Sequence, residues 1–260
     1  MSKGKDVLVY HGENGKKLFL VALMLENRVG SIADVASRLE KAKLSIQSGF
    51  ISSAGEGRYG RCSFYVLAND GRHSAKELAD VLGKSPFAKE VEVKEAHKGM
   101  LVESLSFPLR WSSGDRAILF RTHFFTVMEQ GIRSILSSGA DVVLYQMGYN
   151  HGRPSWTELL SNYRVDSAED LQEISYIYSA AGWGRIEVMA FDRKEKKASV
   201  KVWDNFEGLV KPDEVKSGCN FVRGHLSGLF STVFDTDDMR VSEVKCISRG
   251  DPACEFSVAG

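Results

Sequence analysis

Two cysteines and a glutamate near the C-terminal end of the sequence have the types and spacing to bind a metal ion. The stretch EVKCISRGDPACEF spans residues 243–256, and in it Cys246 and Cys254 are separated by a Gly-Asp-Pro turn. If this turn centres on Gly250, the two cysteines are cross-strand neighbours with Cβ atoms ~5 Å apart. Such a pair could form a disulfide or supply two thiolates to a metal.

Two further residues favour the metal. Cys219 lies near the start of the preceding predicted helix, and Glu243 precedes Cys246 by three residues. Three thiolates and one carboxylate make a closed four-coordinate site of the kind that zinc accepts. Residues three apart face opposite sides of a flat strand, so Glu243 needs a bulge or a strong twist to reach the same metal as Cys246. The alternative is three unlinked cysteines, two of them incidental neighbours, and spacing alone leaves it open.

The composition narrows the classes of protein that the chain could belong to. It has 260 residues, 43% of them apolar, and equal numbers of basic and acidic residues, 34 of each. The absence of a basic excess argues against a non-specific nucleic-acid binder. No apolar run approaches the ~18 residues of a membrane span, and the first residues do not read as a secretory signal. We therefore expect a cytoplasmic protein, in which thiols stay reduced and clustered cysteines bind metal more often than they pair.

The first hundred residues have the pattern of a ferredoxin-like sandwich. The apolar run KLFLVALML reads as a buried strand, and the helix after it has apolar residues at helical spacing. Ser74 and Glu77 have the spacing of a capping box at the start of a second helix. The expected order is strand 17–25, helix 31–41, strand 45–54, strand 61–69, helix 74–85 and edge strand 89–97.

This order, with ENRVGSIADVASRLEKAKLSI after the first strand, resembles an ACT domain over about residues 15–97. The resemblance implies a small regulatory module that often binds an amino acid. Asn27 and Gly30 match the loop that carries the ligand site in that family, although Val29 stands where proline is common. A glycine there would let a ligand approach the backbone, and helix N-terminal amides attract a carboxylate. The alternative is that Gly30 only makes the turn and Asn27 only caps it.

The composition changes after residue 98, and the remaining residues predict a mixed α/β domain. A hairpin is expected over 104–120, and Pro154 is expected to break a helical pattern that runs from residue 140 to 163. Gly224 and Gly228 lie four apart on the predicted helix 216–235, where each costs about 1 kcal/mol relative to alanine. They imply that a helix, a subunit or a ligand comes close to that helix. We expect domains at 1–98 and 99–260 and an α+β fold.

The end of the chain resembles the 4-vinyl reductase (4VR) domain. The resemblance rests on GCNFVRGHLSGLFSTVFD followed by VSEVKCISRGDPACEFSV, and it extends over about residues 100–260. The family includes the sensor domains of aromatic-responsive transcription activators and shares a fold with vesicle-tethering proteins that hold a lipid. In the sensor branch, Cys, Glu, Cys and Cys coordinate zinc, which implies Cys219, Glu243, Cys246 and Cys254 as the ligands here.

The same resemblance implies a buried pocket for a small aromatic or hydrophobic molecule, with a tryptophan and a histidine at the polar group of the ligand. VWDNFEG resembles the segment that carries the tryptophan, which makes Trp203 the candidate. His225 and His151 are both candidates for the histidine, and Phe221 and Tyr149 are candidate lining residues. The alternative is that these side chains are ordinary core residues.

The leading interpretation is a ligand-binding regulatory or sensor protein with two modules. One module would bind an amino acid and the other a small aromatic or hydrophobic molecule beside a structural zinc. Four protein ligands leave such a zinc no position for substrate water, which favours a structural over a catalytic role. A homodimer is expected because ACT sandwiches tend to pair. Without a DNA-binding segment after the second module, output would pass through a protein partner.

Two alternatives remain. The 4VR resemblance implies a reductase of a tetrapyrrole vinyl group, or an accessory protein of such an enzyme. The sequence shows no nicotinamide or flavin motif that would supply hydride for this reaction. The other alternative is a dimeric scaffold that binds no ligand.

Overall fold

The computed structural model describes residues 16–52, 57–69, 71–111, 114–209, 218–237 and 239–260, and the backbone of residues 9–11. The chain divides into two compact units, Met1–Ile118 and Leu119–Gly260, and each is described by itself. The domain boundary expected at residue 98 stays a prediction. In the described ranges, no helix has the length and apolar character needed to cross a membrane.

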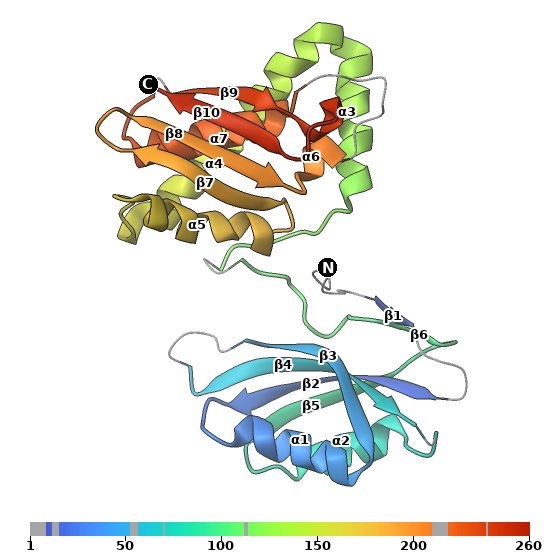
Figure 1. Ribbon diagram of the computed structural model, residues 1–260. Coiled ribbons are helices and arrows are strands. Elements are labelled where there is room, and N and C mark those ends of the chain that lie inside the picture. Colours follow the sequence, from blue (N-terminus) through green and yellow to red (C-terminus); the bar gives the residue numbers. More distant parts are fainter. Residues whose placement is uncertain are drawn as a thin grey trace. The chain divides into compact units, whose positions relative to one another are not determined.

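The first unit contains a four-stranded antiparallel sheet with helices on one face (Figure 1). The central strand β2 (Lys17–Glu26) is buried along most of its length, as its apolar run predicts. This βαββαβ arrangement confirms the ferredoxin-like fold that the sequence indicates. The sheet order is β3-β4-β2-β5, and the other elements are α1 (Ser31–Lys41), β3 (Leu44–Ser52), β4 (Tyr59–Ala68), α2 (Ala75–Gly83) and β5 (Ala88–Glu95).

Local signals in the sequence account for the helices of this unit. In α1, Val35 and Leu39 lie one turn apart and both are buried against the sheet. At the start of α2, the backbone N–H of Glu77 donates to the Ser74 hydroxyl and the backbone N–H of Ser74 donates to the Glu77 carboxylate. The predicted capping box is thereby confirmed.

The opposite face of the sheet is covered by a short two-stranded ribbon. Its strands are β1 (Val9–His11) and β6 (Met100–Val102), which pair in antiparallel fashion. Leu101 is buried there against Leu18, Leu20 and Tyr65. Both faces of the central strand β2 are therefore covered, which explains why it is apolar without alternation.

The second unit contains another four-stranded antiparallel sheet, in the order β7-β8-β10-β9 (Figure 1). The strands are β7 (Arg185–Asp192), β8 (Lys197–Trp203), β9 (Arg240–Lys245) and β10 (Cys254–Ala259). The helices are α3 (Thr122–Leu136), α4 (Ala140–Leu159), α5 (Ala168–Ala180), α6 (Phe206–Leu209) and α7 (Asn220–Val233), and short 3-10 turns follow α3 and α4. The two units together confirm the α+β fold class.

Four glycines allow α4 and α7 to pack backbone against backbone. A Cβ atom added at Gly224 would collide with the carbonyl oxygen of Tyr145, and one added at Gly228 would collide with the backbone of Arg153. Gly148 and Gly152 on α4 face the backbone of α7 in the same way. The glycine spacing on α7 therefore serves helix packing, which is one of the alternatives that the sequence leaves open.

Two local expectations are wrong. Pro154 does not break the helix: it lies inside α4, which continues to Leu159. Packing against α7 along the glycine face outweighs the single hydrogen bond that proline removes. The hairpin expected over 104–120 is reduced, in the described residues, to one isolated bridge between Arg110 and Arg116.

Candidate functional site

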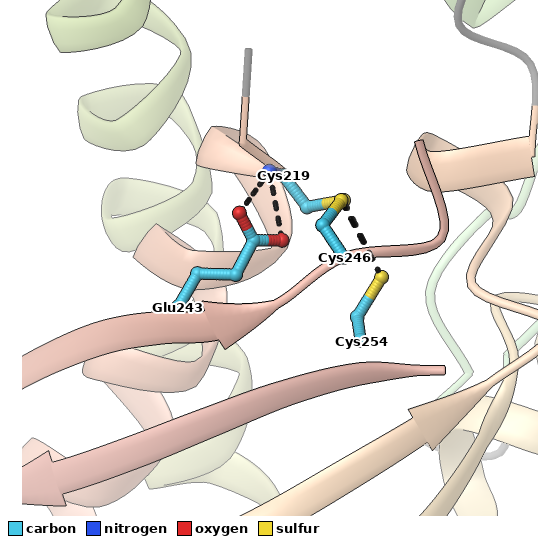
Figure 2. Close-up of side chains that lie close together, drawn as sticks. All are labelled: Cys219, Glu243, Cys246 and Cys254. Atoms are coloured by element: carbon cyan, nitrogen blue, oxygen red, sulfur yellow. Dashed lines mark hydrogen bonds between the residues drawn. The ribbon is translucent and has the colours of Figure 1, made fainter. Parts of the chain in front are cut away.

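Four side chains from separate parts of the second unit converge at one end of its sheet (Figure 2). Cys219 is the residue immediately before α7, and Glu243 lies on β9. Cys246 follows β9, and Cys254 is the first residue of β10. The hairpin thus supplies three of the four groups, and the start of α7 supplies the fourth.

The distances between these groups suit a tetrahedral metal site. The Sγ atom of Cys219 lies 3.5 Å from that of Cys246 and 3.7 Å from that of Cys254, and the last two are 3.8 Å apart. One oxygen of Glu243 completes a set in which all ligand atoms lie within 4.8 Å of one another. Thiolates bound ~2.3 Å from a tetrahedral zinc lie ~3.8 Å apart. The cluster could therefore hold a metal ion without rearrangement of the thiols.

A β-bulge brings Glu243 to the same side as Cys246. Lys245 pairs with Glu255 and Glu243 pairs with Phe256, so β9 advances two residues where β10 advances one. The extra residue is Val244, whose side chain is exposed. The bulge that the Glu-x-x-Cys spacing requires is present at this position.

The surroundings support a charged site that is closed to solvent. The three cysteines are buried, and the side chain of Glu243 is 5% exposed. Both oxygens of Glu243 accept from the backbone N–H of Cys219, at 3.1 and 3.2 Å, and Arg249 lies 3.4 Å away. Burial, and then the neighbouring Cys246, raises the pKa of Glu243 to about 7.

Backbone contacts hold the thiols in place. The carboxylate of Asp251 accepts from the backbone N–H of Cys246 at 2.9 Å, and the backbone N–H of Ile247 donates to the Cys254 sulfur at 3.5 Å. Hydrogen bonds from Cys219 and Cys254 hold the pKa of the Cys246 thiol far below its usual range. The cluster therefore keeps a thiolate at neutral pH, and a thiolate is the form that binds metals.

Glu207 supports the site from α6 and was missed in the sequence. It is fully buried, and its two oxygens accept from the backbone N–H groups of Phe221 and Val222, at 3.1 and 2.8 Å. A carboxylate at this position satisfies the first turn of α7 and complements its dipole, which fixes the position of Cys219. The only signal was one acidic residue in the short segment NFEG, which does not reveal its distant partners.

A second group of interest is an aromatic cluster between α4, α5 and α7. In it, the ring of Trp183 lies 4.8 Å from that of His225, and the ring of His151 lies 5.1 Å from that of His225. Trp156, Tyr178 and His225 are buried, whereas Trp183, Phe206 and Phe221 are partly exposed. The members of this aromatic cluster are His151, Trp156, Tyr178, Trp183, Phe206, Phe221 and His225.

The aromatic cluster contains polar groups at its buried end. The hydroxyl of Tyr178 hydrogen-bonds to Nδ1 of His225. Trp156 is 2% exposed, and its indole Nε1–H has no hydrogen-bond partner among the described residues. Burial, and then His151, lowers the pKa of His225 to about 3, so this ring is neutral at physiological pH. An unsatisfied buried donor is rare enough to call for an acceptor that is not part of the chain.

The structure brings together only some of the predicted pocket residues. Phe221 and His225 belong to the aromatic cluster, and so does His151, the second histidine candidate. Trp203 lies at the end of β8 and donates from Nε1 to Glu187 at 2.8 Å, and the Tyr149 hydroxyl accepts from Arg153 at 2.8 Å. Trp156 was missed because nothing in its local sequence distinguishes it from a core tryptophan.

The loop predicted to bind an amino acid lies in the first unit. Gly30 precedes α1 with a φ of 92°, a left-handed conformation that favours glycine. The backbone N–H of Asn27 donates to the carbonyl oxygen of Arg58 at 2.8 Å. Val29, between them, is almost fully exposed. The structure thus gives Gly30 a conformational role in the turn, and a ligand at this loop stays a prediction.

Comparison with known proteins assigns the C-terminal part. Residues 199–259 match the family model of the 4VR (vinyl-4-reductase) domain, which is the type expected from the C-terminal motif. A comparison with curated proteins found no match. Among solved structures, the phenol-responsive sensory domain of the transcription activator PoxR, solved with phenol, matches with a TM-score of 0.50 and 20% identity. The match covers 57% of this chain and 79% of that domain, and it shows a shared fold.

Two further structures match with TM-scores below 0.5, and no conclusion rests on them. A vinyl-4-reductase family protein from Methanocaldococcus jannaschii has 22% identity and a TM-score of 0.37, with 55% of this chain and 82% of that one covered. The ACT domain of the GTP pyrophosphokinase of Chlorobium tepidum has 15% identity and a TM-score of 0.26, with 31% and 88% covered. The likeness of the first unit to an ACT domain therefore rests on its βαββαβ order.

Proposed function

From the premise that this chain carries a 4VR domain at residues 199–259, we propose that it is a sensor of a small aromatic or hydrophobic molecule. The ligand would bind within the aromatic cluster, and a structural zinc ion would hold the end of the sheet to α7. The single observation that carries the proposal is the buried, unpaired Nε1–H of Trp156 among aromatic rings.

Zinc is the metal that the donor set favours. Three buried thiolates select soft or borderline ions, and the S–S distances of 3.5 to 3.8 Å match tetrahedral coordination. Cys219, Glu243, Cys246 and Cys254 would be the ligands, and zinc so bound cross-links chain segments without reacting. Glu207, Asp251 and the Cys219 amide orient these ligands from outside the coordination sphere.

The chemistry of the aromatic cluster indicates what the ligand offers. Its rings supply flat apolar surfaces, and Trp156 supplies a hydrogen-bond donor at the buried end. A molecule with an aromatic or apolar body and one oxygen acceptor, such as a phenol, would satisfy both. The shared fold with the phenol-responsive domain of PoxR supports this class of ligand.

The direct experiment is a titration of the purified protein with phenol, followed by tryptophan fluorescence and calorimetry. We expect saturable binding, because Trp156 and Trp183 would report a ligand within the cluster. In Trp156→Phe, which keeps an aromatic ring but removes the donor, binding should weaken at least tenfold, the effect of losing one hydrogen bond to a buried group.

Trp203→Phe is the matched control. The Trp203 indole donates to Glu187 at the end of β8, so this substitution should leave phenol binding unchanged. The opposite result, with loss in Trp203→Phe and none in Trp156→Phe, would return the site to the tryptophan that the sequence resemblance implied. A protein that binds no phenol, and carries no small molecule in native mass spectrometry, would contradict the proposal.

We further propose an amino-acid site at the Asn27–Gly30 loop of the first unit, as the ACT resemblance implies. The test is a thermal-shift screen with the twenty amino acids. A shift in the wild type that disappears in Gly30→Val would support the site. If no amino acid shifts the melting temperature of the wild type, the loop has only its role in the turn.

A further inference from the structure

Helix α3 has its polar and apolar sides reversed relative to an ordinary surface helix. Within Thr122–Leu136 the one buried residue is Glu129, which is 4% exposed. In contrast, Phe124, Val127 and Ile135 are 50%, 52% and 80% exposed. A helix at a protein surface normally turns its apolar stripe to the core and its charges to water. This reversal indicates that the outer side of α3 is not a final surface.

The charges of α3 are used inside the unit. Arg133 donates to Glu129 at 2.9 Å on the same helix and to Asp141 at 2.7 Å on α4. Asp141 also accepts from the side chain of Asn220, the first residue of α7. Glu129 and Arg133 therefore fix the inner side of α3 to α4 and α7. They leave the outer side without charge.

The outer side forms one continuous stripe. At 100° per residue, Phe124, Val127, Gly131 and Ile135 fall within about 80° of one another and roughly opposite Glu129. Phe120 extends the stripe before the helix, since its ring stacks on that of Phe124 with 4.4 Å between centroids. We call Phe120, Phe124, Val127, Gly131 and Ile135 the α3 stripe.

Gly131 lies at the middle of the stripe, and nothing within the unit requires it. A Cβ atom added there would meet no atom within 4 Å. A glycine inside a helix costs about 1 kcal/mol relative to alanine, so its use in open space is unexplained by the folded unit. Elsewhere in this chain glycines inside helices mark the close approach of another helix, as on α4 and α7.

We propose that the α3 stripe is the contact between two copies of this chain, which cross at Gly131 about a two-fold axis. In an antiparallel crossing at that residue, Val127 of one copy faces Ile135 of the partner subunit, because both are four residues from Gly131. The stripe is then complementary to itself, as an isologous interface requires. An uncharged surface meets an uncharged surface, and the glycine lets the two backbones approach.

The area is sufficient for a stable pair. The exposed apolar side chains in and beside the stripe are those of Leu119, Phe120, Phe124, Val127, Ile135, Leu136 and Val142. They present roughly 700 Å², close to the ~800 Å² that each partner contributes to an interface of standard size. The interface would be apolar, so its stability should change little with salt concentration.

The first experiment measures the mass of the full-length protein by light scattering and sedimentation at micromolar concentration. The wild type should be a dimer, and Ile135→Glu should weaken the dimer at least a hundredfold, because two carboxylates would be buried near the axis. Met189→Glu is the matched control: Met189 is 53% exposed on β7, so this variant should stay a dimer. Circular dichroism and metal content establish that both variants fold.

The second experiment tests the crossing point itself. The four native cysteines are buried, so Gly131→Cys adds a single accessible thiol. At a two-fold axis, this thiol meets its own copy and should form an intersubunit disulfide on mild oxidation, which requires Cα atoms within ~7 Å. Gln130→Cys, one residue away and about 100° around the helix, should not.

Three results would overturn the proposal. One is a wild type that is monomeric at micromolar concentration. Another is a dimer that survives Ile135→Glu but dissociates in Ile51→Glu, which would assign pairing to the exposed edge strand β3 of the first unit. The third is a disulfide that forms as readily through Gln130→Cys as through Gly131→Cys.

Discussion

Each of the four donor side chains has a cost that a metal ion would remove. A buried carboxylate such as Glu243 is unfavourable while its charge is uncompensated, and burial raises its pKa to about 7. Three thiols in contact cannot all ionise for the same reason. A divalent cation reverses both effects, because it stabilises the deprotonated form of every ligand. Metal uptake should therefore release protons and weaken as the pH falls.

The first residue-scale prediction concerns Cys254→Ser. We expect this variant to lose most of its metal and to melt about 10 °C lower, since loss of a ligand costs several kcal/mol and each kcal/mol is worth about 3 °C in a unit of this size. Elemental analysis and a thermal melt measure the two effects. Cys62→Ser, in the first unit, should keep the metal. Stoichiometric metal in Cys254→Ser, or a Cys246–Cys254 disulfide under reducing conditions, would refute the site.

The second residue-scale prediction concerns pH. His225 has a pKa of about 3 in the folded chain, whereas an unfolded histidine titrates near its ordinary value of about 6.5. Between these values the unfolded chain binds a proton that the folded chain does not, so stability falls as the pH drops through this window, by up to about 1.4 kcal/mol per pH unit. Above the window His225 contributes no pH dependence.

His225→Asn isolates this effect. Asparagine places an acceptor near the position of Nδ1, so Tyr178 keeps a partner. Denaturant unfolding of the two proteins at a series of pH values should give a shallower acid dependence for the variant. Since the metal site is the same in both proteins, its own acid loss cancels in the difference. Parallel curves would show that His225 is not held neutral.

The donor residues could be predicted because the information lies in side-chain types and in short spacings. Cys246, Cys254 and Glu243 sit within one hairpin, where turn geometry restricts distance. Glu207 and Trp156 could not be predicted, since their partners lie on elements far along the chain. The same limit explains why Trp203 was the sequence candidate for the ligand site: a short likeness does not report which way a side chain faces.

At the scale of elements, the contact between α4 and α7 positions both sites. Cys219 stands at the start of α7, and His225 lies on the face of α7 that meets α4. Helix propensity alone would have ended α4 before Pro154, and four glycines within two helices would have weakened both. Close backbone packing, which sequence periodicity does not reveal, outweighs these local preferences.

Gly224→Leu tests this contact. A side chain at Gly224 would enter the backbone of α4 at Tyr145, so we expect a loss of about 3 kcal/mol or a failure to fold, as overpacking a rigid contact requires. Gly139→Ala, at the start of α4, is the control: the nearest atom to its Cβ would be 3.8 Å away, and stability should hold or rise slightly. Equal unfolding midpoints for the two variants would contradict tight packing of α4 on α7.

At the scale of the whole molecule, the two units have separate cores and the metal cluster belongs to one of them. We expect two transitions in scanning calorimetry. A strong chelator should lower the transition of the second unit by about 10 °C and leave that of the first in place, because site formation contributes only to the fold that contains it. Cys62, buried in the first unit, makes that transition identifiable: Cys62→Leu should shift it alone. Equal shifts of both transitions on chelation would contradict independent units.

The bulge at Val244 has a consequence for how the hairpin tolerates change. A strand works by parity, since each inserted or deleted residue exchanges the two faces of everything beyond it. The hairpin carries one odd residue, and that residue is what places Glu243 and Cys246 on a common side. A substitution at Val244 is a small change, because its side chain faces solvent. Its deletion would leave every donor in the sequence while turning the carboxylate away from the thiols. Survival of the site thus depends on counting residues there more than on which residue is counted.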